Sequence, residues 1–188
     1  MLPIPGAPLL ALSPGGALLA VCAGPALRLY STAQLLEGGA GPPLRQHQLP
    51  APATQLQWRP AAAAADGAAA DPLELALVTQ AGAALLSARG AVPAPFGAAP
   101  PDTRCLAWSP DGAALAFGHG DAVTFHTPAT GAAASVRVVS QDSRPQEGQS
   151  MAVDGLQFLG DGALLVSATL LEGEATLCTI GVSEAQMM

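Results

Sequence analysis

The stretch RCLAWSPDGAALAFGHGDAVTFHTPATG, residues 104–131, alternates apolar and polar residues around two tight turns. In an extended segment Leu106 and Trp108 would share one side, because successive side chains of a strand point to opposite faces. Residues 109–112, SPDG, supply the Pro, Asp and Gly that favour a tight reversal. We therefore predict a unit of three strands and two turns, with an aromatic residue at the end of the first strand.

The same pattern recurs three more times along the chain. Further copies begin near Leu9, Gln55 and Val153, and an Ala-rich insertion interrupts the second copy. The residues directly before the turns stand about 46 to 50 positions apart. These predicted structural core residues of the units are Leu12, Trp58, Trp108 and Phe158.

The repeats predict an all-β fold of about four blade-like units. Their expected bounds are about 9–36, 54–90, 103–131 and 152–182, with linkers at 37–53, 91–102 and 132–151 and an exposed Ala-rich loop at 60–72. A repeat of this length with short strands is typical of the blade of a β-propeller. The predicted fold class is a degenerate β-propeller that this chain does not complete.

The third unit resembles the WD40-type propeller repeat through WSPDGAALAFGHG and VTFHTPATG. The match departs from that family where its Trp-Asp pair should stand. His126-Thr127 occupies that place in the third unit, and Tyr30-Ser31 occupies it in the first. The resemblance therefore implies degenerate WD40-like blades, in which the family's buried hydrogen-bond network is not expected.

The order of the units is similar to the N-terminal propeller of the cytoplasmic-filament FG nucleoporins. The similar elements are LALSPGGALLAVCAGPALRLYSTAQLL, LQWRP, LALVTQAG, LAWSPDGAALAFGHGDAVTF and VDGLQFLGDGALLVSATLLEGEATL. This resemblance implies a place at the cytoplasmic side of the nuclear pore complex, with other nucleoporins and the DEAD-box RNA helicase of mRNA export as partners. It also implies that Glu172 and Glu174 contact a basic patch, whereas the charge pattern by itself favours a solvated hairpin tip. That family's propeller has more than four blades, so we expect this chain to be a fragment.

The charge of the chain points away from nucleic acid. The formal net charge is −7, and all seven basic residues are Arg. A nucleic-acid groove needs clustered basic residues, whereas these are scattered. We expect no direct nucleic-acid binding, and an acidic surface suits a basic protein partner.

Three cysteines and one long uncharged run set further limits. Cys22, Cys105 and Cys178 are widely spaced within apolar runs, which predicts buried free thiols rather than disulfides or a metal site. Residues 7–27 carry no charge, but SPGG at 13–16 would break a membrane helix. We expect two strands there and no membrane insertion.

Motifs for catalysis are missing or out of context. A P-loop needs a Lys that this chain does not contain. GQSMA at 148–152 falls one residue short of a nucleophile elbow and lies in a polar linker. The three histidines are expected at loop or surface positions, and they are His47, His119 and His126. Asp111, Asp154 and Asp161 are expected to form turns. No enzyme, metal or cofactor is predicted.

These observations favour a binding platform as the function. The leading prediction is a nucleoporin module that docks the mRNA-export helicase. The alternative is a WD40-like scaffold in translation initiation or a ubiquitin ligase complex, located in the cytoplasm. An enzyme on this fold would need acids and bases that converge at a central channel.

Overall fold

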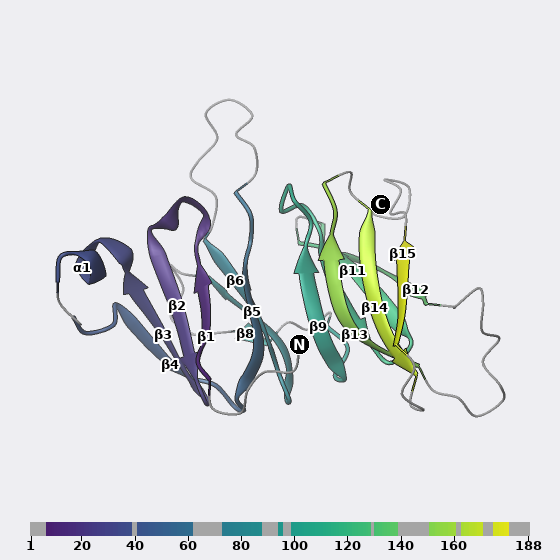
Figure 1. The fold of residues 1–188 in the computed structure, drawn as a ribbon, viewed down its shortest axis with the longest axis horizontal. Helices are drawn as coiled ribbons and strands as arrows, with labels where there is room; N and C mark the ends of the chain where they lie inside the picture. The colour runs from purple at the N-terminus through teal and green to yellow at the C-terminus, as the bar shows by residue number, and fades with distance from the viewer. Residues whose placement is uncertain are drawn as a thin grey trace. The chain divides into compact units, whose positions relative to one another are not determined.

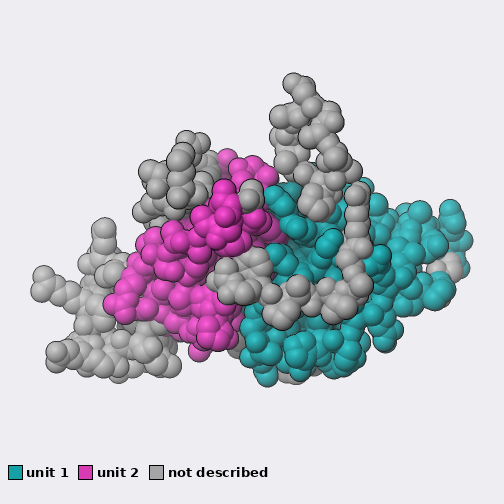
Figure 2. Space-filling view, turned by 180° about the vertical axis from the view of Figure 1, so that it is seen from behind, with its two compact units in different colours: residues 1–96 teal, residues 97–188 magenta. Residues whose placement is uncertain are grey.

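The computed structural model describes residues 7–38, 41–61, 73–87, 94–95, 99–128, 130–138, 151–160, 163–170 and 175–180. They form four antiparallel sheets, three of four strands and one of three (Figure 1). The chain divides into two compact units, residues 1–96 and 97–188, which Figure 2 colours separately. Each unit contains two of the sheets.

The first sheet of unit 1 has the strand order β1-β2-β3-β4. Its strands are β1 (Leu9–Leu12), β2 (Leu18–Ala23), β3 (Ala26–Ser31) and β4 (Arg45–Gln48). A 3-10 turn, η1 (Pro14–Gly16), joins β1 to β2, and the short helix α1 (Thr32–Leu36) follows β3. Gly15 and Gly16 have φ angles of 75° and 73°, which residues with a side chain rarely adopt. The SPGG sequence therefore turns the chain between two strands.

The second sheet of unit 1 has the strand order β5-β6-β7-β8. Its strands are β5 (Ala53–Trp58), β6 (Glu74–Thr79), β7 (Gly82–Ser87) and β8 (Ala94–Pro95). Residues 75–79 of β6 are all buried, as expected for a strand with an apolar environment on both faces.

The two sheets of unit 1 share one core. Its buried members are Ala20, Cys22, Leu27, Leu29, Leu49, Trp58, Leu75, Leu77 and Leu86. Trp58 is 5% exposed, and its indole Nε1–H donates to the carbonyl of Ala11 at 2.9 Å. This bond ties β5 of one sheet to β1 of the other. Full burial of each leucine contributes about 1.5 to 3 kcal/mol, so apolar packing holds the sheets together.

Unit 2 contains a four-stranded and a three-stranded sheet, ordered β12-β11-β10-β9 and β13-β14-β15. The first comprises β9 (Thr103–Trp108), β10 (Leu115–His119), β11 (Ala122–Thr127) and β12 (Ala132–Arg137). The second comprises β13 (Met151–Phe158), β14 (Leu164–Leu170) and β15 (Ala175–Ile180).

The core of unit 2 lies between these two sheets. Its buried members are Cys105, Ala107, Ala116, Val123, Phe125, Val138, Val153, Leu164, Val166 and Ala168. The sheets approach closely at Gly118, where an added Cβ would lie 2.5 Å from Cys105 Sγ and 2.6 Å from Val153 Cγ1. Only glycine leaves room for that approach.

The SPDG turn at residues 109–112 has the expected form. The Ser109 hydroxyl donates to Asp111 Oδ1 at 2.6 Å, and the Ala113 amide donates to the same oxygen at 2.9 Å. Gly112 has a φ of 68° and donates to the Ser109 carbonyl. Asp111 is thus a turn former, as predicted.

Two sequence-based expectations about elements differ from the structure. Each range predicted as a linker contains a strand, namely β4, β8 and β12. These fourth strands are polar or rich in Ala and Pro, so they lack the apolar alternation by which the other strands were identified. Asp154 does not form a turn, because it lies within β13 at a β-bulge. Asp161 and residues 62–72 of the predicted Ala-rich loop lie outside the described residues.

No helix in the described part of the chain has the length and hydropathy of a membrane span.

Candidate interaction surfaces

Of the residues predicted to bind a partner or to form the core, two lie outside the described residues, three are buried or partly buried, and one is exposed. Glu172 and Glu174 lie outside the described residues. Trp58 and Trp108 are buried, at 5% and 2% exposure, and Phe158 is a partly buried residue packed on the core of unit 2. Leu12 is 59% exposed, so the prediction that it is a core residue is wrong for this structure.

The reason for the exposure of Leu12 is the side of β1 on which it lies. Leu9 and Ala11 point to the core of unit 1 and pack against it. Leu10 and Leu12 alternate with them, and they are 63% and 59% exposed. No described residue of unit 1 covers this opposite side enough to bury either leucine.

We call that opposite side of β1, β2 and β3 the leucine face. The cross-strand register places its main residues side by side, and they are Leu10, Leu12, Leu19, Val21, Arg28 and Tyr30. Four of the six are aliphatic, and Arg28 is the charged member. A sheet face of this composition is suited to contact with another protein surface.

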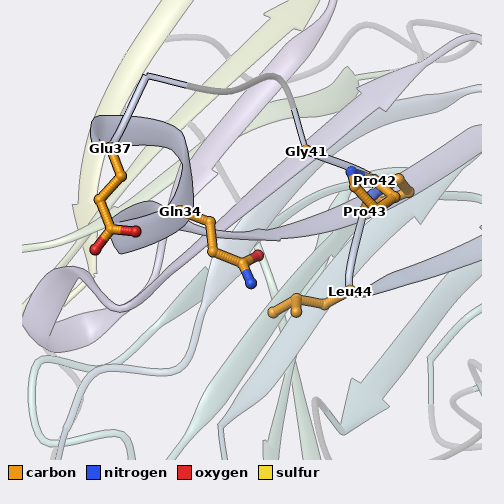
Figure 3. Close-up of a pocket in the computed structure, with 6 residues that line it drawn as sticks. All are labelled: Gln34, Glu37, Gly41, Pro42, Pro43 and Leu44. Atoms are coloured by element: carbon orange, nitrogen blue, oxygen red, sulfur yellow. The ribbon is translucent and has the colours of Figure 1, made fainter.

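A second candidate surface surrounds the connection from α1 to β4. A shallow groove of about 450 Å³ is lined by Gln34, Glu37, Gly41, Pro42, Pro43 and Leu44. Figure 3 shows Gln34 and Glu37 extending from the α1 end of the connection, with Pro42, Pro43 and Leu44 along the other side.

Two exposed leucines accompany this groove. Leu36, the last residue of α1, is 86% exposed, and Leu44 is 51% exposed. Glu37 adds an exposed carboxylate next to Leu36 in the sequence. The groove therefore combines apolar side chains with a negative charge, which suits a partner that presents an apolar residue beside a basic one.

A chain of polar side chains crosses the first sheet of unit 2. His119 Nδ1 lies 3.8 Å from Asp102 Oδ1, and His119 Nε2 lies 2.8 Å from Thr124 Oγ1. The Thr124 hydroxyl also lies 2.6 Å from that of Ser135. The series thus connects the end of β10 to β11 and β12.

A carboxylate, an imidazole and a hydroxyl in series can activate a nucleophile. Here Thr124 is 5% exposed and its hydroxyl is shared with Ser135, so we assign the series a structural role. The series was not among the sequence-based predictions. The available signal was GHG at 118–120, which ends β10 and begins the following turn.

Two of the three histidines do not lie at the loop or surface positions that the sequence predicted. His47 and His126 lie within β4 and β11, at 8% and 7% exposure, and not at loop or surface positions. Burial lowers the pKa of both, and for His47 the nearby Arg45 lowers it further. Both imidazoles are therefore held neutral near pH 7.

Cys22 and Cys105 are free and buried, and the side chain of Cys178 lies outside the described part of the structure. Burial raises the pKa of Cys105 to about 12, with a further contribution from the Asp154 carboxylate. Burial also raises the pKa of Cys22. Because the thiolate is the nucleophilic form, neither thiol is a reactive nucleophile near pH 7. Within the described ranges, no three His, Cys, Asp or Glu side chains gather where they could hold a metal ion.

Comparison with known proteins identifies the fold. No family model matches the chain, and no curated protein matches it. Among solved structures, the Cps50 (Swd1) β-propeller domain of Myceliophteria thermophila matches with a TM-score of 0.60 and 16% identity, over 85% of this chain and 48% of that one. Hydrazine synthase of Kuenenia stuttgartiensis matches with a TM-score of 0.62 and 13% identity, over 94% of this chain and 51% of that one.

These likenesses and the four antiparallel sheets define an all-β protein with the fold of a WD40-like β-propeller. The predicted fold class is confirmed. The chain spans about half the length of these solved chains, in agreement with an incomplete propeller. At such low identity the likeness establishes the fold alone, and the nucleoporin resemblance stays a prediction.

Proposed function

We propose that this chain is a protein-interaction module built on propeller blades. The observation that carries the proposal is the groove between α1 and β4, which Glu37 and Leu44 line, with Leu36 exposed next to it at the end of α1. Exposed leucines cost free energy in water, and a partner that covers them recovers it. The net charge of −7 favours a partner with a basic surface.

The module acts by binding rather than by catalysis. Ser109 and Asp111 are hydrogen-bonded to each other within a turn. The Asp154 carboxylate accepts hydrogen bonds from Ser167 and Thr169, and His119 is hydrogen-bonded to Thr124. These polar groups are already engaged in structural contacts. We therefore propose no enzymatic activity, metal or cofactor.

The sequence resemblance supports a more particular role. We propose that the chain acts at the cytoplasmic side of the nuclear pore complex, where it contacts other nucleoporins and docks the DEAD-box RNA helicase of mRNA export. The support is the order of the four repeats and the elements quoted above. An acidic module and a basic patch on the helicase would be electrostatically complementary.

The alternative is a cytoplasmic WD40-like scaffold in translation initiation or a ubiquitin ligase complex. It uses the same fold and the same groove but different partners. The repeat pattern that it shares with the WD40 type favours this possibility.

The test is a binding measurement between the full chain and purified mRNA-export helicase, by biolayer interferometry. We expect saturable binding that weakens about tenfold or more when Leu36 and Leu44 are both changed to Asp. The matched control is Ala133→Asp, an exposed position of β12 in unit 2, which should leave binding unchanged. Binding to initiation factors or ligase subunits without helicase binding would support the alternative, and binding to none of these proteins would contradict the proposal.

A further inference from the structure

The leucine face is equivalent to sheet faces that are covered elsewhere in the chain. Leu12 is the last residue of β1 before its turn, as Trp58 is in β5 and Phe158 is in β13. All three pair with a Leu on the next strand. Position for position, Leu12 thus lies where its counterparts contact another sheet.

The surface that covers such a face has a recognisable composition. Trp58 shares a core with small or branched residues of the first sheet, which are Ala20, Cys22, Leu27 and Leu29. Phe158 packs against a core to which the neighbouring sheet contributes Cys105, Ala107, Ala116, Val123 and Phe125. Small side chains let two pleated sheets approach to about 10 Å and interdigitate. We therefore expect the leucine face to fit a sheet face that is rich in small residues.

The outer side of β13 and β14 is a sheet face of this kind. Register places its residues opposite the core-facing ones, and they are Ala152, Asp154, Gly155, Gln157, Leu165, Ser167 and Thr169. Three of the seven are Ala, Gly or Ser. We call this surface the Asp154 face.

The two faces also have complementary charges. The Asp154 carboxylate is exposed, and it accepts hydrogen bonds from the Ser167 hydroxyl at 2.6 Å and from the Thr169 hydroxyl. Arg28 lies on the leucine face between Val21 and Gln46, and it forms no ion pair with another described residue. Each face thus offers one charge, of opposite sign, within a mainly uncharged surface.

We propose that two copies of this chain associate head to tail, with the leucine face of each copy packed on the Asp154 face of the other and Arg28 paired with Asp154. The chain spans 48% and 51% of the two solved chains it matches, so two copies supply about as much chain as one of them. Two reciprocal contacts close the pair, whereas a single contact would generate an open filament. Burial of Leu10 and Leu12, which are 63% and 59% exposed, provides the apolar driving force.

The first test is the mass of the intact chain in solution, measured by size-exclusion chromatography with light scattering. We expect twice 18.6 kDa. A monomer over the whole accessible concentration range, or an open series of higher oligomers, would overturn the proposal.

The second test is a charge exchange across the contact, followed by analytical ultracentrifugation. Arg28→Asp and Asp154→Arg should each weaken the dimer by about tenfold or more, and their combination in one chain should restore it. The control is Arg104→Asp, an exposed position of β9 that belongs to neither face, which should leave the dimer intact. A dimer that survives both single changes, or one that the combination fails to restore, would show that other surfaces meet.

Asp154→Arg removes two hydrogen bonds, so a cross-linking arm provides a readout that does not depend on that variant's stability. Copies with Arg28→Cys are mixed with copies with Asp154→Cys, both in a Cys178→Ser background, under mild oxidation. We expect a disulfide-linked heterodimer, identified by mass spectrometry of the linked peptides. Equal linking in a control mixture of Arg104→Cys and Asp154→Cys copies, or no linking in either mixture, would contradict the proposed pairing.

Discussion

At the scale of single residues, Trp58 combines apolar burial with one directed hydrogen bond. Its ring lies in the core of unit 1, and its Nε1–H bonds to the Ala11 carbonyl at 2.9 Å. Ala11 belongs to β1, an edge strand of its sheet, so this bond joins that strand to β5 of the second sheet. The indole at this position therefore packs in the core and also fixes β5 relative to β1 through its hydrogen bond.

We expect Trp58→Phe to lower the free energy of unfolding by about 1 to 3 kcal/mol. The variant loses one buried hydrogen bond and leaves a small cavity. Urea denaturation followed by circular dichroism measures the change. Tyr30→Phe, an aromatic change on the leucine face, is the control and should have a much smaller effect. An unchanged midpoint for Trp58→Phe would contradict the role assigned to the indole bond.

The Asp154 carboxylate makes stability depend on pH. Hydrogen bonds from Ser167 and Thr169 lower its pKa in the folded chain below the ordinary value of 3.8. A carboxyl with a lowered folded pKa stabilises the fold at pH values above its unfolded pKa, and this stabilisation is lost as pH falls through the folded pKa.

We therefore expect the stability difference between the native chain and Asp154→Asn to be constant near neutral pH and to shrink below about pH 3.8. Thermal unfolding of both proteins across this acid range measures it. In Ser167→Ala the carboxyl should titrate closer to its ordinary pKa. A difference that grows on acidification would have the wrong sign for this account.

At the scale of elements, the close approach of two sheets in unit 2 depends on Gly118. An added Cβ would lie 2.5 Å from the Cys105 sulfur and 2.6 Å from Val153 Cγ1. Both neighbours belong to the same core, so they have little room to move.

We expect Gly118→Ala to cost about 1 to 3 kcal/mol of unfolding free energy, because it overpacks this core. Gly41→Ala is the control, since no atom lies within 4 Å of its added Cβ. Chemical denaturation compares the two variants. Adding Cys105→Ala or Val153→Ala to Gly118→Ala should recover part of the loss, and equal stability of the two glycine variants would rule out the steric explanation.

The elements also show what the sequence can and cannot predict. The strands around SPDG were predictable because alternation and turn residues are local signals. The fourth strands were not, since RQHQ of β4 and AP of β8 owe their strand geometry to pairing with β3 and β7 rather than to their own pattern. Likewise, aligning the turns of the four repeats correctly placed Leu12 at the end of its strand. Whether another sheet covers that residue depends on which sheet lies beside it, and the pattern of the strand itself does not indicate this.

At the scale of the whole molecule, the sequence indicates the fold, whereas the candidate interaction surfaces are found only in the structure. Repeats predicted the propeller fold, which the solved structures confirm. The groove at α1 and the leucine face had no signal in the sequence, because exposed leucines look like core leucines until the register of the sheet is known. Both surfaces became recognisable only from the side of the strand, or the end of the helix, on which each leucine lies.

The proposed pairing of two copies predicts that stability depends on protein concentration. When unfolding is coupled to dissociation, mass action raises the thermal midpoint as the concentration rises. We expect this rise for the native chain, measured by calorimetry over a wide concentration range. Leu12→Asp should abolish it, because a charge on the leucine face opposes burial in the contact. Leu36→Asp is the matched control, since Leu36 is 86% exposed on α1 and outside that face, and it should keep the dependence. A native midpoint that does not move with concentration would mean that the leucine face is uncovered in solution, and its exposed leucines would then need a partner other than this chain.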